Sequence, residues 1–142
     1  MAPDATLIAI DPYRPGRSGL NYQKRIAESE VKAVRNGTVV WLRQTGAAAA
    51  RAPCVLTAPF DFVFVDGDHS YEGLRQDWEG WSPLVTPDGI IALHDSLLPA
   101  GKVDAGSVRY SNEVVVHDPR FEIVDEVFTL RVLRRRALEP LS

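Results

Sequence analysis

The sequence predicts a three-layer α/β domain with a mostly parallel sheet, closed by an antiparallel strand pair near its C-terminal end. Three observations support this fold class. Apolar runs rich in β-branched residues, which are typical of buried parallel strands, occur at residues 62–65 and 90–93. A helical periodicity fills the interval between them. Two further short segments, 121–127 and 129–133, are separated by a tight turn and are therefore expected to be antiparallel.

The interval between the two apolar runs is expected to be an amphipathic helix. Its apolar residues recur at helical offsets and form one stripe, which comprises Tyr71, Leu74, Trp78, Trp81 and Val85. Residues 86–89, Thr-Pro-Asp-Gly, are typical of a turn and are expected to end this helix. Strand, helix and strand together form a βαβ unit of about 30 residues. Its first strand is expected to be buried on both faces.

The regions on either side of this unit are expected to continue the α/β pattern. We predict a strand at 6–10, a helix from the N-cap Asn21 to about Arg35, a strand at 38–42 and a short helix at 47–50. The apolar patch 54–56 is not assigned to an element. A loop rich in proline, glycine and serine runs from Ser96 to about Ser107, and loops of this length are usually lids or disordered. A helix at 110–117 is expected before the C-terminal strands.

Composition narrows the classes of protein that fit. The 142 residues suit one domain, taken as 1–142, and a net charge of −3 disfavours nucleic-acid binding through general electrostatics. Cys54 is the only cysteine, which excludes an intrachain disulfide and a multi-cysteine zinc site. No apolar run approaches the roughly 20 residues that span a bilayer, and no secretory signal opens the sequence. We therefore expect a cytoplasmic protein that does not bind membranes.

Ionisable side chains gather at the predicted strand ends. Asp66, Asp68 and His69 follow the first apolar run, and His94 and Asp95 follow the second. Parallel neighbours end at the same edge of a sheet, where ligands bind in open α/β folds, so these five residues are expected to converge in a functional site. The alternative is that each acid only caps the next helix or turn.

Asp11 stands at an equivalent position, directly after the 6–10 strand. A carboxylate there can accept hydrogen bonds from the ribose hydroxyls of a nucleotide cofactor. The alternative, equally supported by the residues, is that Asp11-Pro12 initiates a turn.

The run 62–72, Phe-Val-Phe-Val-Asp-Gly-Asp-His-Ser-Tyr-Glu, resembles one branch of the class I S-adenosylmethionine-dependent methyltransferases, as do Asp77, Trp81, Pro87, Gly89 and His94-Asp95. This branch lies near the O-methyltransferases of the catechol and caffeoyl-CoA type. The resemblance is specific over residues 61–95 and looser over residues 6–135. It implies a Rossmann-like fold, and the C-terminal strand pair looks like the hairpin that closes this fold.

The resemblance implies a role for each matching residue. Asp11 matches the acid that binds the cofactor ribose. Asp66 matches the acid beside the sulfonium, with Asp68 in the same cofactor-binding stretch. Asp66 and Asp95 match the ligands of a metal ion, expected to be Mg²⁺. His69 is similar to a residue proposed as base or ligand, so His69 and Asp66 are the expected catalytic residues.

These roles are consistent with S-adenosylmethionine-dependent O-methyl transfer to a small hydroxylated molecule. The hydroxyl group must lose its proton and lie in line with the methyl group. A hard cation on two carboxylates can lower the pKa of a bound hydroxyl, and a nearby histidine can take the proton.

Two features depart from the pattern of the family. Ser96 stands where the catechol-type pattern has asparagine after the second metal acid. The glycine-rich loop, expected roughly 20 residues before the ribose acid, is missing. Ten residues precede Asp11, none of them is glycine, and no Gly-x-Gly occurs in the sequence. The chain is therefore expected to lack the family's first strand and helix, which leaves a gap beside the 62–65 strand.

Three ways of filling this gap are open. The 6–10 and 62–65 strands could pair directly, residues 54–57 could insert, or a second copy could supply the missing surface. We favour the last, a homodimer. Two other functions also stay open. The chain could be a non-catalytic methyltransferase-like domain that acts in binding or oligomerisation. Alternatively, Asp66-Gly67-Asp68 could be the Asp-x-Asp motif of a metal-dependent glycosyltransferase.

Overall fold

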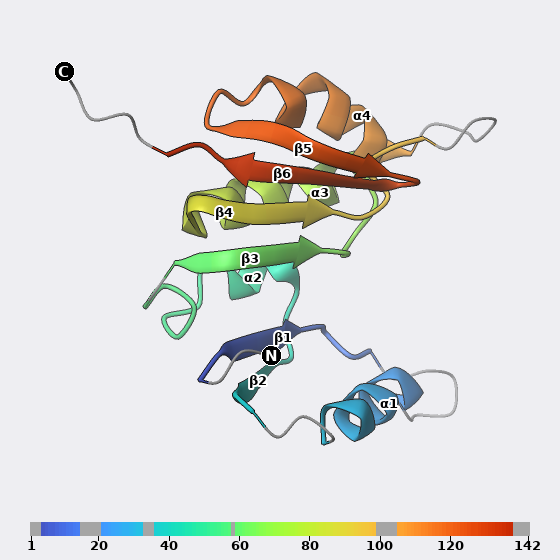
Figure 1. Ribbon diagram of the computed structural model, residues 1–142. Coiled ribbons are helices and arrows are strands. Elements are labelled where there is room, and N and C mark those ends of the chain that lie inside the picture. The colour runs from blue at the N-terminus through green and yellow to red at the C-terminus, as the bar shows by residue number, and fades with distance from the viewer. Residues whose placement is uncertain (1–3, 15–20, 33–35, 58, 99–104, 138–142) are drawn as a thin grey trace. The chain divides into compact units, whose positions relative to one another are not determined.

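The structure is a computed structural model that describes the chain except for residues 1–3, 15–20, 33–35, 58, 99–104 and 138–142 (Figure 1). The chain forms two compact units, residues 1–49 and residues 50–142. The expectation that the two form a single domain stays a prediction.

The N-terminal unit is a parallel strand–helix–strand arrangement followed by a short helix. Its elements are β1 (Thr6–Ile10), α1 (Tyr22–Val31), β2 (Thr38–Leu42) and α2 (Gly46–Ala49). β1 and β2 are parallel along their whole length, from the pair Thr6–Thr38 to the pair Ile10–Leu42. The predicted N-cap is confirmed, because the Asn21 side chain accepts a hydrogen bond from the Lys24 backbone N–H at 2.7 Å. The helix ends earlier than predicted, and the expected end at Arg35 lies outside the described residues.

The C-terminal unit is a four-stranded sheet of order β3-β4-β6-β5. Its elements are β3 (Phe60–Val65), α3 (Tyr71–Trp81), η1 (Ser82–Leu84), β4 (Val85–Leu93), α4 (Gly106–Glu113), η2 (Val115–His117), β5 (Phe121–Val127) and β6 (Leu130–Arg135). β3 and β4 are parallel, whereas β6 is antiparallel to both β4 and β5. The α/β class, the central βαβ unit and the antiparallel C-terminal pair are therefore confirmed.

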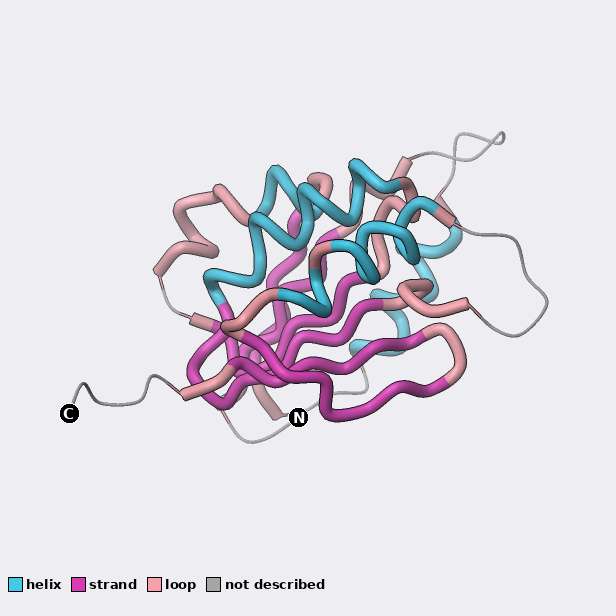
Figure 2. The backbone as a smooth tube through the Cα atoms, turned by 90° about the horizontal axis from the view of Figure 1, so that it is seen from above, coloured by secondary structure: helices cyan, strands magenta, loops and turns pink. Residues whose placement is uncertain are grey.

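The core of this unit lies between the sheet and the helices α3 and α4. Alternate strand residues are buried on this side, among them Val65, Ile91, Leu93 and Leu133. α3 and α4 pack against each other and lie along the same face of the sheet (Figures 1 and 2). The rings of Trp78 and Phe121, from α3 and β5, lie 4.9 Å apart and join helix to sheet.

The expectation that the 62–65 strand is buried on both faces is wrong. Val63 and Val65 are buried at 9% and 8% exposure, but Phe62 and Phe64 are 59% and 51% exposed. The physical reason is that α3 and α4 lie along one face of this sheet (Figure 1), so alternate side chains of β3 that point to the other face are exposed. An unbroken apolar run does not distinguish this arrangement from burial on both faces.

The expectation that residues 86–89 form a turn ending the helix is also wrong. The helix ends at Trp81, and β4 already begins at Val85. The turn residues form an irregularity in the ladder, because the pair Phe60–Val85 is followed by the pair Phe62–Ile90. Asp88 takes a positive φ of 63° there, a conformation that aspartate tolerates better than most residues. Residues 86–89 therefore lie at a bulge-like irregularity within β4 and not in a separate turn.

The structure narrows how the predicted gap is filled. Among the described residues, β1 pairs only with β2, and β3 pairs only with β4. The unassigned segment 54–57 forms turns and not a strand. Insertion of 54–57 as a strand is therefore not seen, while direct pairing and the homodimer stay predictions. No helix in the described part of the chain is long and apolar enough to cross a membrane.

A candidate active site at the carboxyl ends of β3 and β4

The ends of β3 and β4 place two groups of ionisable residues side by side. The last residues of the two strands, Val65 and Leu93, are partners in the parallel ladder. The His94 backbone N–H donates to the Val65 carbonyl at 2.9 Å and extends the pairing by one step. Asp66 and His94 therefore leave the sheet at the same edge, as the strand pattern predicts.

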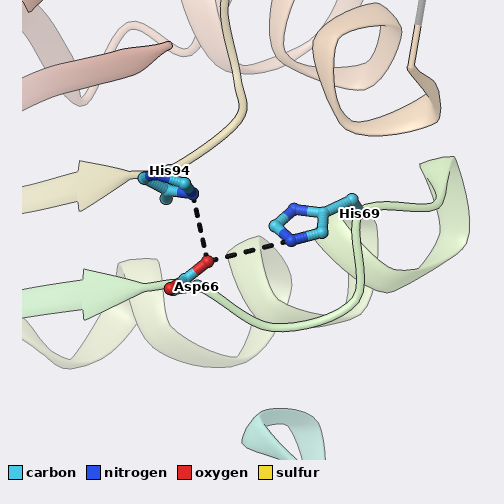
Figure 3. Close-up of side chains that lie close together, drawn as sticks. All are labelled: Asp66, His69 and His94. Carbon is cyan, nitrogen blue, oxygen red and sulfur yellow. Dashed lines mark ion pairs between the residues drawn. The ribbon is translucent and has the colours of Figure 1, made fainter.

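Three side chains meet at this edge (Figure 3). Oδ1 of Asp66 lies 3.1 Å from Nδ1 of His94 and 3.8 Å from Nε2 of His69. A second carboxylate approaches the same ring nitrogens. Asp95 lies 3.6 Å from Nδ1 of His94 through Oδ1 and 3.7 Å from Nε2 of His69 through Oδ2. Two imidazoles and two carboxylates thus form one cluster.

The cluster is open to small molecules but contains one buried nitrogen. The four side chains are between 40% and 49% exposed. Nδ1 of His94 is nevertheless buried, and it has no hydrogen-bond partner in the described structure. The Asp66 oxygen 3.1 Å away lies at an angle unsuited to a hydrogen bond with this nitrogen. A buried ring nitrogen in this situation can still hold a proton or bind a ligand.

Ser107, at the start of α4, ties the two loops of the site together. Its backbone N–H donates to the carbonyl of His69 at 2.9 Å, and its Oγ donates to the carbonyl of Asp95 at 2.6 Å. Ser107 is 1% exposed, so these bonds are sheltered from water. They help to hold Asp95 at its positive φ of 49°. The loops that carry the cluster are therefore anchored to a helix.

Ser96, which departs from the catechol-type pattern, has a structural role here. Its Oγ donates to the Leu93 carbonyl at 2.8 Å, and its backbone N–H donates to the Thr129 carbonyl at 2.9 Å. The residue is fully buried. It fixes the end of β4 and does not point into the cluster.

Asp68 does not join the cluster. Its Oδ1 accepts a hydrogen bond from the Ser70 backbone N–H at 2.9 Å, and Ser70 in turn caps α3 by accepting from the Gly73 N–H. The backbone and side-chain hydrogen bonds from Ser70 lower the pKa of the Asp68 carboxyl. The capping interpretation therefore holds for Asp68, and its role in cofactor binding stays a prediction.

Asp11 belongs to the N-terminal unit and also makes a turn. Its Oδ1 accepts a hydrogen bond from the Tyr13 backbone N–H at 2.5 Å, beside a positive φ of 45° at Tyr13. Within the described residues, Oδ2 of Asp11 makes no hydrogen bond and is available to a hydroxyl donor. The turn interpretation is thus seen, while ribose binding stays a prediction.

Asp77 is a buried acid that the sequence reasoning did not place near the site. It is 7% exposed. Its burial, and to a smaller extent the negative charge of Asp68, raise its pKa to about 6. The signal was present in the sequence, because position 77 falls on the apolar stripe between Leu74 and Trp81. His94 was likewise expected at this edge, but no role was assigned to it.

Comparison with known proteins places the chain in a family. Residues 2–96, more than half of the 142 residues, match a family described as a methyltransferase domain. The chain therefore belongs to this family of methyltransferase domains.

Solved structures share the fold at low sequence identity. A protein from Corynebacterium glutamicum matches with a TM-score of 0.65 and 19% identity over 94% of this chain and 62% of its own. CalS11, a TDP-rhamnose 3'-O-methyltransferase, matches with a TM-score of 0.58 and 15% identity over 89% of this chain and 56% of its own. MycE, solved with Mg, S-adenosylhomocysteine (SAH) and mycinamycin VI, matches with a TM-score of 0.57 and 14% identity over 92% of this chain and 44% of its own. This chain thus spans less than two thirds of each of these structures.

Proposed function

We propose that this chain acts in S-adenosylmethionine-dependent O-methyl transfer to a small hydroxylated molecule. The observation that carries the proposal is the convergence of Asp66, His69 and Asp95 at the carboxyl edge of a methyltransferase-family sheet. CalS11 supports oxygen as the acceptor, because its name describes an O-methyltransferase. The acceptor is a small molecule, and neither a nucleic acid nor a membrane is proposed as a partner.

The donor set at this edge fits a divalent cation. In the proposed reaction, Asp66 and Asp95 would hold Mg²⁺, the ion that accompanies MycE. The proposal is supported by the position of both carboxylates within 3.8 Å of the same ring nitrogen of His69. The ion would polarise a bound hydroxyl and lower its pKa. Asp66 would then be both a metal ligand and a neighbour of the reacting atoms.

His69 is the proposed general base. Its side chain is 44% exposed and its Nε2 lies within 3.8 Å of both carboxylates, a position from which the ring could take a proton from a bound hydroxyl group. S-adenosylmethionine would supply an electrophilic methyl group for the acceptor oxygen, with cleavage of its carbon–sulfur bond, and His69 would take the hydroxyl proton.

Asp11 and Asp68 are proposed to contribute to cofactor binding. The free oxygen of Asp11 suits a ribose hydroxyl, which is a donor that a carboxylate accepts well. Asp68 already accepts a bond from Ser70, and its second oxygen is the one assigned to the cofactor.

The leading alternative is a methyltransferase-like domain that binds or oligomerises without catalysis. It is favoured by the absence of any Gly-x-Gly in the sequence. The chain also spans only 62% of the Corynebacterium protein. The glycosyltransferase alternative loses its support, because the family match is to methyltransferases and Asp68 caps a turn away from Asp66.

Calorimetry and a transfer assay test the proposal together. We expect the protein to bind S-adenosylmethionine and to transfer its labelled methyl group to members of a panel of sugars and catechols. His69→Ala should slow transfer by on the order of 10²–10⁴-fold while leaving cofactor binding intact. His117→Ala, which removes an exposed histidine of η2, is the matched control. A folded protein that binds no cofactor would favour the non-catalytic alternative, whereas transfer unaffected by His69→Ala would remove this base.

A further inference from the structure

The cluster at the strand ends offers nitrogen donors as well as carboxylates. Oδ1 of Asp66, a ring nitrogen of His69 and a ring nitrogen of His94 all lie within 4.8 Å of one another. Two of these separations are 3.1 Å and 3.8 Å. Donors around a tetrahedral ion with bonds of 2.0–2.1 Å stand about 3.3–3.4 Å apart. The observed spacing brackets this value, so small side-chain rotations would bring the three donors onto one ion.

Asp95 lies beside this set of three donors. Its two oxygens approach different rings, Oδ1 at 3.6 Å from Nδ1 of His94 and Oδ2 at 3.7 Å from Nε2 of His69. The donor set is therefore two imidazoles and one carboxylate, and water can take a fourth position. Such a set differs in kind from the two-carboxylate site expected for Mg²⁺, because two of its three donors are nitrogen.

The buried nitrogen of His94 points independently to a ligand. Nδ1 is shielded from water and makes no hydrogen bond in the described structure, a costly state for a polar atom. Binding an ion would satisfy it. The ring is also held in place, because the His94 backbone bonds to Val65 and the ring packs 6.3 Å from that of Phe64.

We propose that Asp66, His69 and His94 bind a divalent transition-metal ion of the zinc or cobalt class, in preference to Mg²⁺. Imidazole suits these ions, whereas Mg²⁺ prefers oxygen ligands and retains its water. The proposal does not rest on methyl transfer, since metal binding is measured without cofactor or acceptor. One consequence does rest on the proposed function. An ion bound to Nε2 of His69 would remove the general base, so Zn²⁺ should inhibit transfer that Mg²⁺ supports.

Metal titrations of the stripped, tag-free protein test the site. We expect calorimetry to show one Zn²⁺ bound per chain, and Co²⁺ to give the intense visible absorption of a four-coordinate ion. His69→Ala and His94→Ala should each weaken Zn²⁺ binding by at least the roughly 10–100-fold that loss of an outer-shell partner costs. His117→Ala and Cys54→Ser remove exposed donors outside the cluster and should leave affinity unchanged.

The histidine ring signals of the unsubstituted protein give a second measurement that needs no variant. The sequence has three histidines. On adding Zn²⁺, the signals of His69 and His94 should shift and that of His117 should not. The proposal is overturned if those two signals are unmoved at saturating Zn²⁺, if His117→Ala weakens binding as much as the cluster variants do, or if equimolar Mg²⁺ displaces Zn²⁺.

Discussion

Gly67 lies directly against the buried carboxylate of Asp77. A Cβ atom placed on Gly67 would stand 2.7 Å from Oδ2 of Asp77, closer than real Cβ atoms approach a neighbour. Gly67 follows Asp66 in the loop that carries the cluster, while Asp77 comes from the middle of α3. A buried side chain of the helix therefore limits what the site loop can contain.

Gly67→Ala should destabilise the protein, because the added methyl group must displace the Asp77 carboxylate from its buried position. We expect a loss of about 1 kcal/mol in the free energy of unfolding. Urea unfolding of the unsubstituted protein, Gly67→Ala, Asp77→Ala and the double variant measures the coupling between the two residues. In an Asp77→Ala background the same substitution should cost much less, and equal costs in the two backgrounds would show that the contact does not matter.

Asp77→Asn should make the protein more stable at neutral pH and flatten its pH dependence. The acid has a pKa of about 6 when folded against 3.8 as its ordinary value, so between these values the folded state binds the extra proton. The free energy of unfolding therefore falls as pH rises from about 4 to about 6 and stays low above it. The full effect is about 3 kcal/mol. The free energies of unfolding of Asp77→Asn and of the unsubstituted protein, measured at pH 4 and pH 7.5, give the difference in pH dependence.

Asp88→Asn is the matched control for this prediction. Asp88 is an exposed aspartate at positive φ, where asparagine is equally tolerated. It should leave the pH dependence as in the unsubstituted protein. If Asp77→Asn and the unsubstituted protein lose stability in parallel between pH 4 and pH 6, Asp77 is not the titrating group.

Asp95→Asn should remove most of the thermal stabilisation that Mg²⁺ provides. A cation that binds only the folded state raises the melting temperature, and loss of one of two carboxylates weakens that binding. Melting curves at millimolar Mg²⁺ measure the effect, with Asp88→Asn again as the control. An unsubstituted protein that is indifferent to Mg²⁺, Mn²⁺ and Ca²⁺ would argue against binding of these three cations, and His69 would remain the proposed base.

Asp11→Ala should weaken S-adenosylmethionine binding by on the order of 1.5–3 kcal/mol, the value of a hydrogen bond to a charged group. The carboxylate also accepts a bond from the Tyr13 backbone, so the variant must first be shown to fold. Asp11→Asn keeps an oxygen for that turn and removes only the charge. Unchanged affinity in both variants would remove Asp11 from the cofactor site.

The protein is predicted to form a homodimer in solution. β3 is an edge strand of its sheet, and its side chains Phe62 and Phe64 are more than half exposed. Burial of such an edge and apolar surface against a second copy would stabilise both chains. Light scattering at micromolar concentration should give the dimer mass, and Phe62→Lys should lower it. A stable, cooperatively folding monomer would contradict this prediction.

Much of the local structure could be predicted from the sequence, because it depends on neighbouring residues. The stripe at Leu74, Trp78 and Trp81 indicates α3, and Asn21 caps α1 as expected. The parallel βαβ pattern also placed Asp66 and His94 at one edge, since strand ends follow directly from strand direction. These inferences need only periodicity, caps and the geometry of a parallel sheet.

What the sequence determined by itself was the order of elements, the methyltransferase resemblance and the edge at which the ionisable residues gather. Only the tertiary structure decided which of them meet. Asp68 accepts a hydrogen bond from the Ser70 N–H, Nδ1 of His94 lies 3.1 Å from Oδ1 of Asp66, and the buried carboxylate of Asp77 lies against Gly67. The exposure of Phe62 beside buried Val63 was decided in the same way. The physical reason is that burial and side-chain contacts depend on which elements cover a face and on ladder register, and neither is encoded by neighbouring residues alone.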